Sequence, residues 1–454
     1  MLDSSDFQLL TEGALDKPSE TFLDLKAKHF LYDSDETTPI HLLATKLRTK
    51  KGYLRNFTVL HMIVVTAYCN CDCHYCHASS SAPEDGPLNM SLDTARAVTD
   101  MVFQSPSPIV KIEFQGGEPL VNWSTVKFII EYAEQKHSRS GKTLELVLCT
   151  NLTRMTEETL RYLQQHNVAI STSLDGPKEL HDQHRICRDG SSTYDAFKSK
   201  LNLVRSTLGS SYPCSPLLTV TKTNLLRLPE VIDQYVDMGF DGIFIRALNP
   251  YGMAKSQWDT LGYSAEAFLS AYKDALAYII FLNRQGTFFT EYYATLLLSR
   301  ILTPFSTGFV DLQSPSGAGI SGVIYDYNGN VYPSDEARML ARVGDDFFLL
   351  GNVHQNDYHQ IFSGKKLRHI IEKSCIETLP GCSWCAYRMY CGVDPIRYYV
   401  ESGDPVGHRP TSTFCKKHIA LFDHLFELLY SGDKDISDVF WSWLTNRELR
   451  EVCL

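Results

Sequence analysis

Strand-like and helix-like runs alternate six times between about residues 58 and 285, and this alternation limits the fold more than any other feature. The predicted strands are nearly continuous apolar runs, which are typical of a parallel sheet covered by helices. Six such units suit a partial (β/α)6 barrel of the TIM type, an α/β fold whose active site lies at the carboxyl ends of the strands. The predicted strands cover 59–65, 110–114, 144–149, 169–174, 217–220 and 242–246, and the predicted helices begin after a Ser91 cap or cover 123–136, 157–165, 229–238 and 265–284.

The rhythm breaks after residue 300, where Gly, Ser, Pro and Asp become frequent. Residues 323–332 contain an Asn328-Gly329 pair between apolar runs, which predicts a hairpin. A cysteine-rich segment and a helix over 419–429 follow. We therefore expect an N-terminal segment over 1–57, the barrel over 58–300, a second domain over 301–430 and a C-terminal tail over 431–454.

Charge and hydropathy exclude several classes of protein. The 454 residues carry a formal net charge of −10, so binding to a nucleic-acid backbone has no global electrostatic support. No run approaches 18 consecutive apolar residues, so no membrane span is expected, and the acidic start does not resemble a signal peptide. A cytoplasmic enzyme that binds neither nucleic acid nor membrane is the expectation.

The chain has 13 cysteines, and they are clustered. Four lie within residues 69–76 and four more lie within 382–415. An odd count without an export signal argues against a disulfide framework. Two metal-binding segments are therefore predicted.

The first cluster is a Cys69-x3-Cys73-x2-Cys76 loop that directly follows the first predicted strand. Three protein thiolates would leave the fourth iron of a [4Fe–4S] cluster open to a small molecule. A zinc site is the alternative, although structural zinc usually takes four ligands from two hooks. We expect Cys71 to be a solvent-facing loop thiol, with a competing ligand role as the alternative.

The loop spacing resembles that of the radical S-adenosylmethionine (SAM) enzymes, and a second motif supports the resemblance. After the second strand stands a turn that matches the family's Gly-Gly-Glu-Pro motif, in which glycines allow close approach to a ligand. The resemblance implies that the turn backbone and the Glu118 carboxylate hold the methionyl amino group of SAM. The turn consists of Gln115, Gly116, Gly117, Glu118 and Pro119.

Two later strand ends extend the resemblance. Thr150 and Asn151 stand where relatives have Thr-Asn-Gly, and this chain departs in having Leu152. After the fourth strand, the resemblance implies that Ser173 contacts the SAM ribose and that Arg185, rather than Arg188, meets the SAM carboxylate. Tyr75, inside the cysteine loop, is assigned to the same cofactor site, and His181 is expected to be a surface histidine.

The C-terminal cysteines resemble the SPASM extension of radical SAM enzymes that modify peptides and proteins. That pattern implies one auxiliary [4Fe–4S] cluster, whereas a four-thiolate zinc ribbon is the alternative. A second auxiliary cluster is not expected, because Ser334 and Pro395 occupy two of its ligand positions and no cysteine lies between Cys214 and Cys375. The four ligands expected for the single auxiliary cluster are Cys382, Cys385, Cys391 and Cys415.

Asp335 follows Ser334 in the predicted hairpin region. In related sulfatase-maturing enzymes an Asp at this position acts as general base toward the substrate radical. The resemblance implies the same role for Asp335, since a positioned carboxylate can take the proton released on oxidation. A hydrogen-bonded turn residue is the alternative.

Residues 43–46, 105–108, 311–315, 334–336 and 407–412 resemble the B-type radical SAM maturases of the His-Xaa-Ser peptide system. The resemblance extends over about 40–430 and implies a ribosomally made precursor peptide as substrate. It also implies a second radical SAM protein as partner and a reductant such as flavodoxin or ferredoxin. Within 1–57 it implies at most a partial leader-recognition element. A basic patch there either meets an acidic leader or is a solvated face; it consists of Lys46, Arg48, Lys50, Lys51 and Arg55.

The expected activity is reductive cleavage of SAM at the first cluster, followed by hydrogen abstraction from the peptide by a 5′-deoxyadenosyl radical. The auxiliary cluster would accept a second electron, which gives a net oxidation such as a cross-link or ring closure. Sulfatase-type protein maturation and peptide epimerisation are alternatives. A non-catalytic iron–sulfur or zinc protein is the alternative of a different class.

Overall fold

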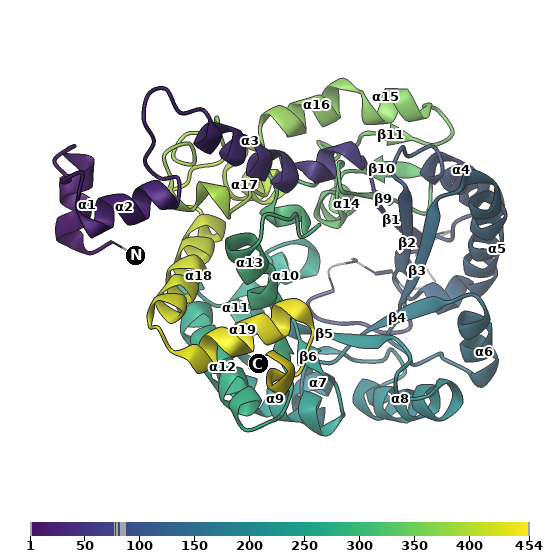
Figure 1. Cartoon of the computed structure of the whole chain (residues 1–454). Coiled ribbons are helices and arrows are strands. Elements are labelled where there is room, and N and C mark those ends of the chain that lie inside the picture. Colours follow the sequence, from purple (N-terminus) through teal and green to yellow (C-terminus); the bar gives the residue numbers. More distant parts are fainter. Residues whose placement is uncertain (1, 77, 79, 82–87, 453–454) are drawn as a thin grey trace.

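The computed structural model describes residues 2–76, 78, 80–81 and 88–452. Its centre is a partial barrel of parallel strands with helices on the outside (Figure 1). This confirms the predicted fold class. Neighbouring strands pair in the order β1 (Leu60–Thr66), β2 (Ile109–Gly116), β3 (Thr143–Cys149), β4 (Val168–Ser173), β5 (Cys214–Val220) and β7 (Ile245–Ala247), and the outer helices include α4 (Leu92–Val102), α5 (Trp123–Ser140), α6 (Glu157–Gln165), α8 (Thr193–Leu208), α9 (Leu228–Asp237) and α12 (Ala265–Arg284).

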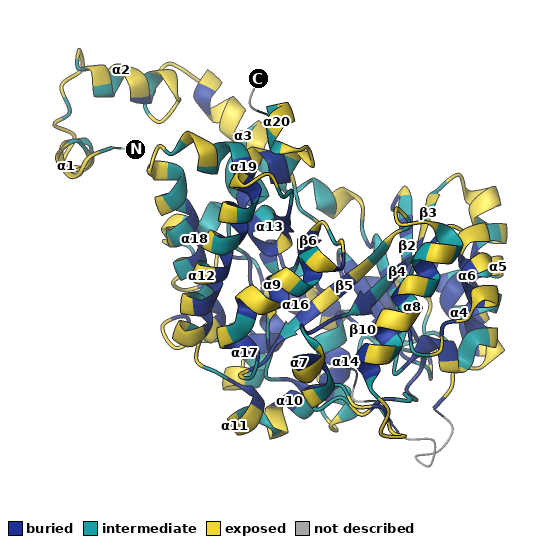
Figure 2. Ribbon diagram, turned by 90° about the horizontal axis from the view of Figure 1, so that it is seen from below, coloured by how far each residue is buried: buried dark blue, intermediate teal, exposed yellow. Residues whose placement is uncertain are grey.

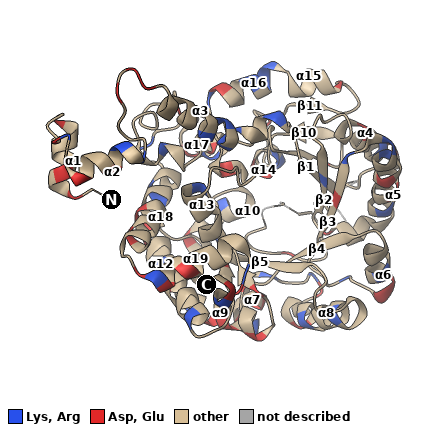
Figure 3. Ribbon diagram, viewed as in Figure 1, with Lys and Arg blue, Asp and Glu red and all other residues tan. Residues whose placement is uncertain are grey.

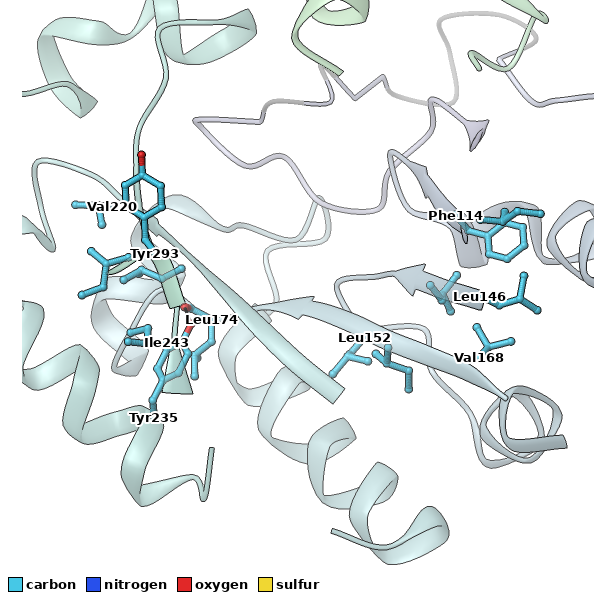
Figure 4. Packing of buried hydrophobic residues seen from close by; sticks show 14 of the residues in the cluster. Phe114, Leu146, Leu152, Val168, Leu174, Val220, Tyr235, Ile243 and Tyr293 are labelled. Carbon is cyan, nitrogen blue, oxygen red and sulfur yellow. Dashed lines mark hydrogen bonds between the residues drawn. The ribbon is translucent and has the colours of Figure 1, made fainter. Parts of the chain in front are cut away.

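Alternation of side chains along the strands builds the core between sheet and helices. In β2, Val110, Ile112 and Phe114 are fully buried, whereas the residues between them are only partly buried. Figure 4 shows Phe114 packed near Leu146 and Val168 from the next two strands. One face of each strand therefore belongs to the core, and the other face lines the inside of the barrel.

The sixth predicted strand is interrupted. Its first part, β6 (Gly242–Ile243), pairs with β8 (Thr290–Glu291), and its second part, β7, pairs with β5. Two helices after β4, α7 (Lys178–His184) and α8, were not predicted from the sequence. Ser91 caps α4 as predicted, because its hydroxyl accepts the Thr94 N–H.

The predicted hairpin is present and extends the barrel sheet. Its strands β9 (Gly322–Tyr325) and β10 (Asn330–Tyr332) pair antiparallel, and Gly329 has a positive φ of 84° in the turn. β9 also pairs parallel to β1, and β11 (Gly351–Asn352) completes a continuous nine-stranded sheet. The segment after residue 300 is thus joined to the barrel through backbone hydrogen bonds.

The N-terminal helices α1 (Ser4–Thr11) and α2 (Glu20–Ala27) stand away from the body (Figures 1 and 2). α3 (Thr38–Lys50) returns to it and carries basic residues (Figure 3). Lys50 at its end and Lys51 just after it attach α3 to the body: Lys50 donates to the Arg300 and Met389 carbonyls, and Lys51 pairs with Glu377.

The remaining helices cover the C-terminal third. The segment expected as a tail instead forms α19 (Lys434–Thr445), which buries Val439, Phe440 and Trp443 against α12 and α13. No helix among the described residues is long and apolar enough to cross a membrane. The helices after α12 are α13 (Tyr292–Leu302), α14 (Asp335–Arg342), α15 (Tyr358–Phe362), α16 (Lys365–Glu372), α17 (Pro395–Ser402), α18 (Thr413–Tyr430), α19 and α20 (Leu449–Val452).

Candidate active site

The cluster loop, residues 69–76, follows β1 at the carboxyl end of the barrel. A second segment, residues 184–188, holds it along much of its length. The Asp72 N–H donates to the Ile186 carbonyl at 2.7 Å, the His74 N–H to the His184 carbonyl at 3.0 Å, and the Arg188 N–H to the Asn70 carbonyl at 2.9 Å. Backbone pairing therefore fixes the loop that carries Cys69, Cys73 and Cys76.

The chemistry of these thiols suits a cationic centre. Burial raises the pKa of the Cys73 thiol to about 12, opposed by Arg185 and reinforced by Cys76 and Cys69. Hydrogen bonding from Cys71 lowers the pKa of the Cys69 thiol. Several buried thiols cannot all ionise side by side unless a positive charge compensates them. The iron–sulfur core of a cluster provides that charge. The donor set therefore fits the predicted three-thiolate cluster.

Cys71 does not face solvent, so that prediction is wrong. It is 2% exposed, and its Sγ lies 3.6 Å from Sγ of Cys187. The side-chain amide of Asn151 donates to the Cys71 sulfur at 3.4 Å. The hydrogen bond to Cys69 and burial both raise the pKa of Cys71, which favours a neutral thiol. Cys71 therefore packs the loop against the 184–188 segment.

The two glycines of the Gly-Gly-Glu-Pro turn permit a close approach between backbones. A Cβ on Gly116 would lie 2.3 Å from the Thr66 carbonyl oxygen, and one on Gly117 would lie 2.1 Å from that of Tyr68. The Gly117 and Glu118 N–H groups donate to these two carbonyls. The glycines thus bring the turn against the start of the cluster loop, a reason that differs from the predicted approach to a ligand.

The Glu118 carboxylate joins the ends of two strands. Its Oε1 accepts the Leu120 N–H at 3.1 Å and the Thr150 hydroxyl at 2.7 Å, and its Oε2 accepts the Asn151 N–H at 2.8 Å. The side chain is fully buried, and burial raises its pKa against these hydrogen bonds. A carboxylate has about four acceptor positions, of which the protein uses three, and the contact of Glu118 with the SAM amino group stays a prediction.

The Thr150-Asn151-Leu152 segment shows what Asn151 of the Thr-Asn-Gly motif does and how Leu152 is tolerated in place of glycine. The Asn151 amide reaches the cluster loop, where it donates to the Asn70 side chain at 3.1 Å. Leu152 has a φ of 64°, a left-handed conformation that glycine adopts without strain. Its side chain is fully buried in the core (Figure 4), and this burial offsets the strain.

Tyr75 and Arg185 meet at a residue that sequence reasoning missed, Asp175. The Arg185 Nε donates to Asp175 at 2.9 Å, the Tyr75 hydroxyl donates to the same carboxylate, and the guanidinium lies 5.3 Å from the Tyr75 ring centre. Burial acts to raise the pKa of Asp175, but Arg185 holds it below its usual value. Arg185 is therefore positioned beside the cysteine loop, and its contact with SAM stays a prediction.

His181 is buried, so the prediction of a surface histidine is wrong. It is 2% exposed, and its Nδ1 accepts the Asp175 N–H at 3.2 Å. Burial lowers the pKa of His181 to about 4, which keeps the ring neutral at pH 7. The sequence does contain one signal that could have indicated Asp175, namely an Asp-Gly pair directly after a predicted strand.

Two further predicted SAM-site residues lie at element ends. Ser173 is the last residue of β4, and Pro119 begins a short 3₁₀ helix over Pro119–Asn122.

Polar side chains line the inner face of the barrel near this loop. The Glu113 carboxylate accepts the Gln115 amide at 2.6 Å and the Cys149 thiol at 3.3 Å. All three residues are partly exposed, unlike their buried neighbours on the outward face. Polar groups on this face are suited to contact a substrate that enters the barrel.

Asp335 is the first residue of α14 and lies beside this interior. Ser334, which replaces the expected cysteine ligand, caps α14 by accepting the Ala337 N–H at 3.3 Å. The Arg338 Nε is 3.8 Å from the Asp335 carboxylate, and an Nη of Arg338 donates to the Ala78 carbonyl beyond the cluster loop at 3.3 Å. Burial raises the pKa of Asp335, opposed by Arg338 and Arg246. One arginine thus contacts both this carboxylate and the segment that follows the cluster loop.

The four-cysteine site, consisting of Cys382, Cys385, Cys391 and Cys415, has a small apolar core of its own, to which Val393, Tyr398 and Phe414 contribute. Burial and the neighbouring thiols raise the pKa of Cys391 to about 12, and they also raise that of Cys415. The Arg409 Nε donates to the Cys382 sulfur at 2.9 Å.

Both Nη atoms of Arg409 are buried without a hydrogen-bond acceptor among the described residues. Buried guanidinium donors need acceptors, so the site fits a group that presents further sulfur atoms. In the part of the chain that the structure describes, no three His, Cys, Asp or Glu side chains are arranged to hold a single metal ion.

The chain is similar to several known proteins. Residues 63–213 match the Radical SAM superfamily. An uncharacterized protein of Methanocaldococcus jannaschii is 29% identical over 192 residues, which cover 42% of this chain and 63% of that protein. A cysteine-type anaerobic sulfatase-maturating enzyme of Clostridium perfringens is 23% identical over 386 residues, which cover 81% of this chain and 96% of that enzyme.

Two solved structures share the fold. The structure of anSMEcpe with bound AdoMet superposes with a TM-score of 0.68 at 19% identity and covers 83% of this chain and 100% of that one. Streptococcus suis SuiB bound to the precursor peptide SuiA superposes with a TM-score of 0.57 at 12% identity and covers 90% and 88%. These likenesses, together with the family match and the cysteine loop, lead to one conclusion: residues 63–213 of this chain form a radical SAM domain.

Proposed function

We propose that this chain is a radical SAM maturase that oxidises a ribosomally made peptide, of the kind processed in His-Xaa-Ser systems. The observation that carries the proposal is the cysteine loop held at the carboxyl end of the barrel, beside a polar interior that Asp335 borders. When bound, SAM and a [4Fe–4S] cluster supply a 5′-deoxyadenosyl radical that removes a hydrogen atom from the peptide.

The residues of this chain prepare that chemistry. Cys69, Cys73 and Cys76 would hold the cluster and would leave one iron for SAM. The turn of residues 115–119, with Thr150, Asn151 and Ser173, orients SAM, while Arg185 presents a fixed positive charge next to Tyr75. Positioning of this kind removes orientational freedom before the reaction, which is a large part of a catalyst's effect.

Asp335 accepts the proton that leaves the peptide as it is oxidised. Its raised pKa suits this role, because a base works best when its pKa lies nearer the working pH. Its position at the first residue of α14 also places it beside Arg338, which donates to Ala78 just after the cluster loop.

The four-cysteine site would hold an auxiliary [4Fe–4S] cluster, which would supply an acceptor for the second electron from the peptide. Support comes from the buried Arg409, whose Nε donates to the Cys382 sulfur, and from the Cys382-x2-Cys385-x5-Cys391 spacing. Two clusters in all are therefore proposed, with flavodoxin or ferredoxin as reductant and a second radical SAM protein as partner.

Protein maturation of the sulfatase type is the second candidate. It is favoured by the alignment with the Clostridium perfringens enzyme, which covers 96% of that enzyme. The two candidates differ in substrate, so mass spectrometry distinguishes them. The chain would be co-expressed anaerobically with a His-Xaa-Ser precursor or with a peptide that carries the sulfatase cysteine or serine. A loss of 2 Da from the precursor alone supports the first candidate; oxidation of the sulfatase peptide alone supports the second.

A further inference from the structure

Arg409 is buried against the Cys382 sulfur of the four-cysteine site. It is 8% exposed, and its Nε lies 2.9 Å from Sγ of Cys382. Its guanidinium carbon lies 4.0 Å from the ring centre of Tyr398, which fixes the plane of the group. Gly381 leaves room for the side chain, because a Cβ there would lie 3.3 Å from the Arg409 Cγ.

The guanidinium has more donors than the protein uses. Only Nε donates to a described residue, and the two Nη atoms are buried without an acceptor in the described structure. A buried cation with unmet donors is costly unless negative charge lies against it. Four cysteine thiolates around an iron–sulfur cluster provide both the negative charge and the missing sulfur acceptors.

Reduction changes the charge that Arg409 faces. A [4Fe–4S]²⁺ cluster with four thiolates carries two net negative charges, and one added electron makes three. A fixed positive charge stabilises the more negative state more strongly, and burial limits the screening by water. Hydrogen bonds to the sulfur atoms of a cluster are one of the factors that set its potential.

We propose that Arg409 raises the reduction potential of the auxiliary cluster and so makes it an acceptor for the substrate electron. This inference rests on the proposed function of the four-cysteine site. In turnover the peptide carbon loses a hydrogen atom to the 5′-deoxyadenosyl radical, an electron to the cluster and a proton to a base. Arg409 is a positioning residue in this scheme, since it acts on the cluster and not on the peptide.

The test uses the full chain with Cys69, Cys73 and Cys76 changed to Ala, so that only the auxiliary cluster remains. After anaerobic reconstitution, iron is counted and the midpoint potential is measured by electron paramagnetic resonance during a dithionite titration. We expect Arg409→Met to keep about four irons and to weaken electron binding at least about tenfold, which is 59 mV for a one-electron couple. The midpoint potential of Arg409→Lys should lie between those of the parent and Arg409→Met, because lysine keeps the charge but loses the planar guanidinium donors.

Lys416→Met is the matched control. It removes one positive charge beside Cys415, but from an exposed side chain, so screening by water should keep the change below about twofold. If Arg409→Met holds its iron and its midpoint potential changes no more than that of Lys416→Met, the inference is wrong. If Arg409→Met loses iron, Arg409→Gln decides, because it also removes the charge but keeps an amide donor: a midpoint potential equal to that of the parent overturns the inference, and a lower one supports it. A parent chain that binds zinc or no metal overturns the auxiliary cluster itself, and with it the role of Arg409.

Discussion

Replacing Glu118 by Gln tests how the strand ends are held together beneath the cluster loop. The glutamate accepts three hydrogen bonds in a fully buried position, from the Leu120 N–H, the Thr150 hydroxyl and the Asn151 N–H. The glutamine oxygen can keep the two bonds on Oε1. Its NH₂ group then faces the Asn151 N–H, so two donors meet where a donor and an acceptor stood.

The expected loss is local and can be calculated from this contact. Leaving a buried donor unpaired costs about 1–3 kcal/mol. At 25 °C this corresponds to roughly 5- to 150-fold in an equilibrium constant. The backbone N–H of Asn151 should therefore exchange with deuterium roughly 5- to 150-fold faster in Glu118→Gln than in the parent, as measured by hydrogen-exchange mass spectrometry of a peptide covering 150–152. SAM binding to the reconstituted protein should weaken in the same variant.

Glu157→Gln is the matched control for this experiment. Its carboxylate pairs with Arg161 on the exposed surface of α6, with 58% of the side chain accessible, so the same chemical change should alter little. Equal exchange of the Asn151 amide in both variants would refute the reasoning, since it would mean that the buried carboxylate does not hold the segment.

Three further changes test other parts of the account. Cys385→Ala should spare 5′-deoxyadenosine formation but remove the peptide product; a soluble variant with normal product would make the four-cysteine site structural. Asp335→Asn should lower the modified peptide at least about 10²-fold while 5′-deoxyadenosine still forms, and equal losses of both would exclude the base. With Asp335 present, product should also fall as the pH drops toward the raised pKa of this carboxyl, because protonation removes the base. Leu152→Gly relieves the positive φ, worth about 1 kcal/mol, but empties a buried site that costs about 2–5 kcal/mol, so chemical denaturation should show net destabilisation.

The barrel could be predicted because its signals are local. Apolar strands and capped helices repeat along the chain, and predicted helices such as 157–165 and 265–284 coincide with α6 and α12. The pairing of β9 with β1 could not be predicted, since it joins residues about 260 positions apart through backbone atoms that carry no sequence signature. The split of the sixth strand could not be predicted for the same reason, because β6 pairs through its backbone with β8, which comes after α12 in the chain.

The candidate site shows the same division. The cysteine spacing and the Gly-Gly-Glu-Pro turn are short motifs, so the sequence displays them directly. Burial of Cys71 and His181 depends on the distant 184–188 segment and on the packing of α7, so both exposure predictions were wrong. Asp175 and Arg409 were missed as partners because each acts through a contact with a residue far away in sequence.

The central claim is that the three cysteines of the loop hold a cluster that cleaves SAM and that the four-cysteine site holds a second cluster. The most direct test is anaerobic iron analysis combined with a 5′-deoxyadenosine assay under dithionite. The account predicts about eight irons in the reconstituted protein. For the variant with Cys69, Cys73 and Cys76 changed to Ala, it predicts about four irons and no 5′-deoxyadenosine. Continued formation of 5′-deoxyadenosine in that variant would contradict the account.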